Sequence, residues 1–236
     1  QQAPHKKTGR SGRQLSYREN DRAQDALGHV HPAINEAKIV ASYHQTSRYH
    51  TTPLAQMQAG EELLAAGDDH AETGQEFITS AAEDLSIYAR ECFNEETGQF
   101  DAVTTDGERL RWREAKTDYY TPASFKPRSA DPFLFWSYCT AFRLTGDAIH
   151  WAMVRRIAEQ FGLGELGVAP EGPASIKLTT DADDWRIIYA LLELCDATEN
   201  AALLKLAARV GDNVVERQHA SGLFPRSGRE YARTGD

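Results

Sequence analysis

Apolar residues recur at helical spacing along most of the chain. The clearest stripe holds Phe77, Ile78, Ala81, Ala82, Leu85, Tyr88, Ala89 and Cys92, three or four residues apart, as on the buried face of a helix. Similar stripes follow Asp131-Pro132, from Phe133 to Phe142, and Asp147, from Trp151 to Phe161. The pattern predicts an all-α protein.

Proline and glycine mark the ends of further predicted helices. His31-Pro32 opens one that continues to Tyr43, and Thr52-Pro53 opens another that ends at Gly67. Two more are expected over residues 181–197 and 199–218. Residues 1–28 are polar and without apolar periodicity, so we expect an extended arm there and one domain over residues 29–236.

One segment has the pattern of strands. Residues 100–104 and 110–112 flank Asp106-Gly107, a dipeptide that is common in tight hairpins. A small β-hairpin is therefore predicted near residues 100–112.

The last four predicted helices form two similar pairs. A shift of 53 positions places Trp151 on Leu204, Phe135 on Ile188 and Thr145 on Thr198. Repeated helical hairpins indicate a solenoid or a closed toroid, and the aromatic side chains favour two packed helix layers in an α/α barrel. The alternative is an irregular helical domain in which the repeat is accidental.

Charge and composition exclude several classes of protein. The formal net charge is -9, which argues against a nucleic-acid partner. The chain has no apolar run of about eighteen residues, so we expect no membrane partner. Cys92, Cys139 and Cys195 lie far apart in apolar helical patterns and are predicted to be buried thiols rather than a disulfide or zinc framework.

Several segments resemble the pectate lyases of polysaccharide lyase family 2, and they occur in the same order. They are HKKTGRSG at 5–12, NDRAQDALG at 20–28, AAEDLSIYARECFNEETGQFDAVTTDGERL at 81–110, AFRLTGD at 141–147 and LAARVGDNVVER at 206–217. Cys139, His150 and the loop at 167–177 depart from the pattern. The resemblance covers most of the chain.

The resemblance implies an α/α barrel that cleaves polygalacturonate or oligogalacturonate by β-elimination. It also implies a bacterial enzyme of the periplasm or cytoplasm, with a divalent, manganese-like metal held by two histidines and a glutamate, and an arginine as base. In the family these groups precede the HKKTG-like stretch, so no catalytic residue and no metal ligand is assigned here. We accordingly expect an internal to C-terminal portion of the enzyme, which requires the N-terminal remainder of the same polypeptide.

Elimination on a uronide needs a locally basic site, because a cation must neutralise the carboxylate as negative charge develops. The loop at 111–128 is basic and interleaved with aromatic residues in an otherwise acidic chain. Aromatic rings stack on sugars, and Arg and Lys bind carboxylates. The predicted substrate contacts in this loop are Lys116, Tyr119, Tyr120, Lys126 and Arg128. The alternative is a solvated charged loop shaped by prolines.

Arg48 and His50 form a second candidate cluster for the sugar groove. His29, His31 and His50 are a weaker alternative as metal ligands, because no carboxylate accompanies them at ligand spacing. Acidic residues occur as adjacent doublets, which point apart on a helix, although two distant doublets can converge in a barrel. Another toroid enzyme, a glycoside hydrolase or sugar epimerase, and a noncatalytic helical-repeat binding module therefore remain alternatives.

Overall fold

The structure is a computed structural model that describes residues 46–101, 103, 127–171 and 174–224, with only the backbone described for residues 46–50. The predicted arm at 1–28 and the predicted helix at 31–43 lie outside these residues. The chain forms two compact units, Gln1–Ala130 and Asp131–Asp236, which are described separately here. The single domain expected over residues 29–236 stays a prediction.

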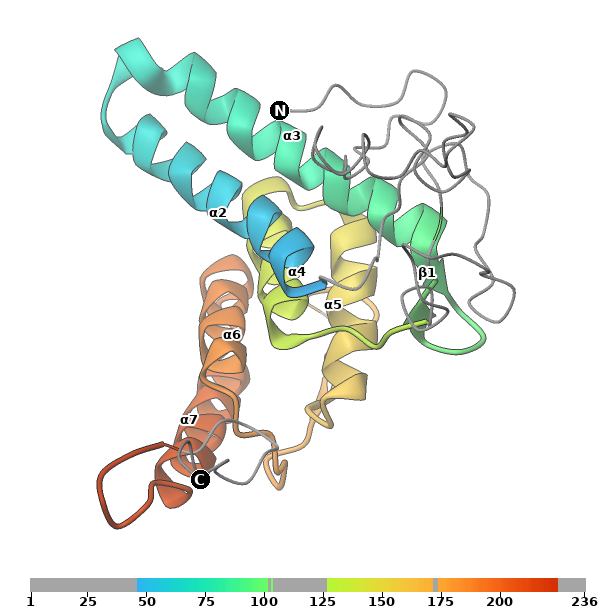
Figure 1. The fold of residues 1–236 in the computed structure, drawn as a ribbon, viewed down its shortest axis with the longest axis vertical. Coiled ribbons are helices and arrows are strands. Elements are labelled where there is room, and N and C mark those ends of the chain that lie inside the picture. Colours follow the sequence, from blue (N-terminus) through green and yellow to red (C-terminus); the bar gives the residue numbers. More distant parts are fainter. Residues whose placement is uncertain (1–45, 102, 104–126, 172–173, 225–236) are drawn as a thin grey trace, which may run out of the picture. The chain divides into compact units, whose positions relative to one another are not determined.

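The first unit is built on a hairpin of two long helices, α2 (Thr46–Ala65) and α3 (Asp68–Cys92) (Figure 1). The predicted stripe of α3 is confirmed, since Ile78, Leu85 and Tyr88 are buried in it. The predicted start of α2 at Thr52-Pro53 is wrong, because the helix begins at Thr46 and continues through Pro53. A proline inside a helix removes one hydrogen bond, and here the helix continues without it.

A short strand pair follows α3. β1 (Phe93–Asn94) and β2 (Gln99–Phe100) are antiparallel, with Phe93 opposite Phe100. The Asn94 side chain closes the turn by accepting hydrogen bonds from the backbone N–H groups of Glu96 and Thr97, and Gly98 takes a left-handed conformation at φ 66°. The hairpin that Asp106-Gly107 predicts falls in residues 104–126, outside the described residues.

The second unit contains four helices: α4 (Pro132–Thr145), α5 (Ala148–Gln160), α6 (Trp185–Thr198) and α7 (Ala201–Glu216). Helix α4 packs against both α5 and α6, and α6 packs against α7. A small pair, β3 (Gly164–Glu165) and β4 (Ser175–Ile176), lies in the connection between α5 and α6. The core includes Leu134, Phe135, Tyr138, Leu191 and Leu194, all of which are fully buried.

The 53-residue repeat is present in the structure. Helices α4 and α6 have 14 residues each and begin 53 positions apart. Helices α5 and α7, of 13 and 16 residues, also begin 53 positions apart. The turns also match, because the hydroxyls of Thr145 and Thr198 each donate to the carbonyl four residues back. The same hydroxyls accept from the backbone N–H groups of Asp147 and Asn200. Two copies of one helical hairpin therefore form this unit, and closure into a barrel stays a prediction.

The observed ends of these helices lie within a few residues of the predicted ends. The prediction that Asp131-Pro132 caps α4 is confirmed, since the Asp131 carboxylate accepts from the backbone N–H of Leu134 at 2.8 Å. The predicted start at 181 is wrong, because Asp184 caps α6 and the helix begins at Trp185. No helix among the described residues is both long and apolar enough to cross a bilayer.

Candidate functional site

Arg128 is the predicted substrate contact whose side chain the structure describes. Its backbone N–H and carbonyl exchange hydrogen bonds with Phe100, at 3.0 and 2.8 Å, which extends the small sheet of β1 and β2 by one bridge. Phe100 is 1% exposed and stacks on Tyr88 of α3, with ring centroids 4.7 Å apart. The end of the basic loop is thereby fixed to the core of the first unit.

The guanidinium group of Arg128 is partly buried. Its Nε is inaccessible to solvent and has no hydrogen-bond partner among the described residues. A guanidinium presents donors in a planar fork that matches a carboxylate, and a buried donor without a partner costs free energy. Arg128 therefore has the chemistry to receive a carboxylate at a backbone position held by Phe100.

The other predicted contacts are not placed beside Arg128 by the structure. Lys116, Tyr119, Tyr120 and Lys126 lie in the segment outside the described residues. Arg48 and His50 fall within the first residues of α2, where only the backbone is described. Their convergence on one sugar groove stays a prediction.

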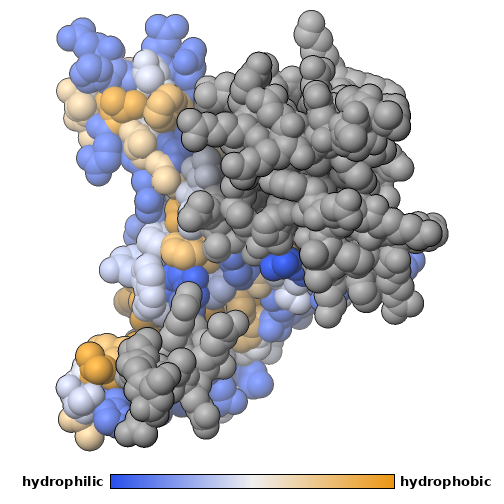
Figure 2. Space-filling model, viewed as in Figure 1, coloured by the Kyte–Doolittle hydropathy of each residue, from blue (hydrophilic) through white to orange (hydrophobic). Residues whose placement is uncertain are grey.

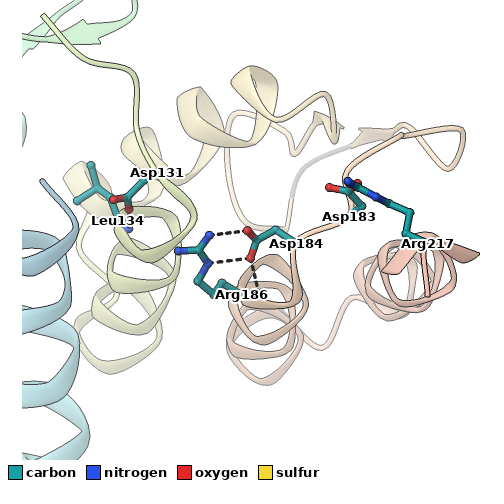
Figure 3. Close-up of polar contacts among 6 residues, drawn as sticks. All are labelled: Asp131, Leu134, Asp183, Asp184, Arg186 and Arg217. Carbon is teal, nitrogen blue, oxygen red and sulfur yellow. Dashed lines mark hydrogen bonds and ion pairs between the residues drawn. The ribbon is translucent and has the colours of Figure 1, made fainter. Parts of the chain in front are cut away.

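The second unit contains ion pairs that the sequence analysis did not identify (Figure 3). Asp184 accepts from the Nε of Arg186 at 2.8 Å and also from its Nη2 and its backbone N–H. The hydrogen bond to Asp184 raises the pKa of the Arg186 guanidinium. The neighbouring Asp183 pairs with Arg217 just after α7. Asp184 thereby caps the start of α6, and Asp183 links the preceding residues to the end of α7.

Glu193 of α6 joins two helices. Its carboxylate accepts from the indole nitrogen of Trp136 at 3.1 Å and pairs with Arg143, both on α4. Burial, together with the Glu193 charge, raises the pKa of the Cys139 thiol well above its ordinary value. Cys139 is therefore a buried thiol that holds its proton more strongly than an exposed cysteine does. The prediction of buried thiols is confirmed for Cys139 and Cys92, while Cys195 is half-buried.

The described histidines and acids do not assemble a metal site. No group of three His, Cys, Asp or Glu side chains converges within the described residues. His150 is fully buried, and its Nδ1 lies 3.0 Å from the hydroxyl of Thr145, so it supports the turn between α4 and α5. His29 and His31 lie outside the described residues.

A match to one protein family covers the whole chain. The model of a family described as periplasmic pectate lyase matches residues 1–236. That range contains the two repeated hairpins, the strand pair and the Arg128 bridge. The chain therefore belongs to the periplasmic pectate lyase family.

Proposed function

We propose that this chain works as part of a pectate lyase that cleaves polygalacturonate or oligogalacturonate by β-elimination. The observation that carries the proposal is the family match over residues 1–236. In this reaction a base removes the proton beside the uronide carboxylate, the glycosidic C–O bond breaks, and a carbon–carbon double bond remains in the new chain end. The carboxylate must be neutralised while negative charge develops beside it.

The basic loop supplies that neutralisation in our proposal. Arg128 receives a uronide carboxylate from its fixed position beside Phe100. Lys116 and Lys126 add positive charge, and Tyr119 and Tyr120 stack on sugar rings. Arg48 and His50 line the same groove. The half-buried guanidinium of Arg128 supports this role, because a guanidinium presents a planar fork of donors that binds a carboxylate.

The proposal includes a location in the periplasm, because the family is described as periplasmic pectate lyase. It also includes a divalent, manganese-like metal, which rests on the resemblance of the sequence segments alone. A metal in such a site supplies charge neutralisation at the carboxylate. The described residues do not fit such a site, since they contain no group of three potential ligands. We therefore derive no step through a metal from these residues and assign the catalytic base to none of them.

Analysis of the reaction products distinguishes a lyase from a hydrolase. The polypeptide translated from the complete gene is incubated with polygalacturonate, and its products are examined by mass spectrometry. A lyase yields an unsaturated fragment lighter by one water than the product of hydrolysis. Saturated fragments would assign the chain to hydrolysis, and an unchanged polymer that nevertheless binds to the folded protein would favour a binding module.

A further inference from the structure

The strand pair of the first unit continues into the segment that contains Arg128. Phe93 lies opposite Phe100 on one side, and Arg128 lies opposite Phe100 on the other. Residues directly opposite each other in antiparallel strands point to the same face of the sheet. Phe93, Phe100 and Arg128 therefore share one face. The next residues along share the other face, where the side chain of Gln99 donates to the hydroxyl of Ser129 at 3.4 Å.

The register of this segment decides which way the guanidinium of Arg128 points. A slip of one residue would move Arg128 to the opposite face and bring Ser129 into its place. Two backbone hydrogen bonds join Arg128 to Phe100, but backbone groups are much alike in every register. Side chains that are buried on one face are what select a register. The ring of Phe100 is the buried side chain at this position, at 1% exposed.

The ring of Phe100 is held by α3. It stacks on Tyr88 with ring centroids 4.7 Å apart and planes 4° apart, and it touches Phe93 with centroids 5.2 Å apart. Tyr88 is itself 1% exposed, on the buried stripe of α3. A continuous path of contacts therefore runs from the core helix through one aromatic ring to the backbone of Arg128.

We propose that Tyr88 is a positioning residue for substrate binding, acting through Phe100 on Arg128. This inference rests on the proposed function, in which Arg128 receives a uronide carboxylate. A fork of two parallel hydrogen bonds needs a fixed geometry, so a small displacement of the guanidinium weakens it. Without the ring of Tyr88, Phe100 loses its stacking partner and the register of Arg128 is held less firmly.

Burial separates this role from direct contact with a ligand. Figure 2 shows hydrophobic surface over the α6–α7 region, and Trp185 at the start of α6 is 50% exposed. A half-exposed ring is accessible to a ligand, whereas Tyr88 and Phe100 are not. Any effect of Tyr88 on the substrate must therefore pass through the sheet.

The test measures the KM for polygalacturonate of the polypeptide translated from the complete gene. Tyr88→Leu is expected to raise KM about three- to tenfold, the equivalent of one lost aromatic pair. Tyr88→Phe keeps the stacked ring and is expected to keep the original KM. In an Arg128→Ala background, Tyr88→Leu is expected to cause no further rise, because the residue through which it acts is absent.

Gly60→Ala is the matched control for stability. It overpacks the contact of α2 with α3 in the same unit without touching the aromatic stack, so it is expected to lower the melting temperature and leave KM unchanged. Tyr88→Met, with its adaptable side chain, replaces Tyr88→Leu if the latter does not fold.

Three results would overturn the positioning role alone. They are an unchanged KM in Tyr88→Leu, an effect of Tyr88→Leu that persists in full in the Arg128→Ala background, and an equal rise in KM in Gly60→Ala. A folded polypeptide that forms no unsaturated product would instead refute the proposed function, and the positioning role with it.

Discussion

Gly60 of α2 and Gly74 of α3 approach so closely that a Cβ on either residue would lie 2.7 Å from the carbonyl oxygen of the other. Two helix backbones come this near only where side chains are absent. The contact explains why two glycines stand inside long helices, where each costs about 1 kcal/mol relative to alanine. It also fixes the register in which α2 and α3 pack along their axes.

Gly60→Ala is expected to lower the free energy of unfolding by about 1–3 kcal/mol, because the new methyl group overpacks the contact. Gly211 is the matched control, since a Cβ there meets only the Cδ1 of Ile188 at 3.8 Å. Gly211→Ala is expected to stabilise by up to about 1 kcal/mol. Urea denaturation measures both changes. Equal effects of the two substitutions would show that the glycine contact does not set the packing.

Glu193→Ala is expected to destabilise the second unit by about 1–3 kcal/mol, because it removes the acceptor of the Trp136 indole and the ion pair with Arg143. Glu193→Gln retains an acceptor for the indole but removes the ion pair, so its effect is smaller. A double-mutant cycle with Arg143→Ala isolates the pair. Simple additivity of Glu193→Ala and Arg143→Ala would contradict the coupling that the structure shows.

Much of the fold follows from local patterns. The stripe of α3, the cap at Asp131 and the 53-residue repeat are readable because apolar spacing and turn residues act over a few positions. The strand pair at residues 93–100 was missed, although Asn94 and Gly98 are turn residues, because its strands are too short to show alternation. The start of α2 differs from the predicted one, because Pro53 is typical of a first helical turn but lies inside this helix.

The stability of the folded chain is expected to fall above about pH 9 because of Cys139. Burial raises the pKa of this thiol above its ordinary value of 9.0, so the folded state holds the proton after the unfolded state has released it. Stability is complete below the unfolded pKa and decreases as pH rises toward the folded pKa, by about 1.4 kcal/mol per pH unit. Cys139→Ala in a Cys195→Ser background is expected to remove this dependence of the free energy of unfolding on pH. The prediction would be refuted if urea denaturation across pH 8–11 gave the same pH dependence with and without Cys139→Ala.

The candidate site depends less than the fold on local sequence patterns. Basic and aromatic residues in one loop point to an acidic sugar, but their convergence depends on contacts distant in sequence. The bridge between Arg128 and Phe100 spans such a distance. The pair of Glu193 with Arg143 joins α6 to α4, and the pair of Asp183 with Arg217 joins the residue before Asp184 to the end of α7. No short sequence motif predicts either pair.

Arg128→Ala is expected to raise the KM for polygalacturonate about tenfold or more, because the guanidinium pairs with a substrate carboxylate in the proposed site. Arg128→Lys keeps the charge but loses the fork, so it restores part of the affinity. Arg90→Ala, at an exposed position of α3, is the control and leaves KM unchanged. Steady-state kinetics with the complete polypeptide decide this, and a loss of stability without a change in KM would assign Arg128 to the fold alone.

The most direct test of the central claim is ultraviolet absorbance during incubation of polygalacturonate with the polypeptide translated from the complete gene. The assay is run with manganese and with a chelator. The account predicts absorbance from the unsaturated uronide that rises with manganese and stops with the chelator. A folded polypeptide that produces reducing ends without absorbance, or no product at all, would contradict the assignment of this chain to a functioning pectate lyase.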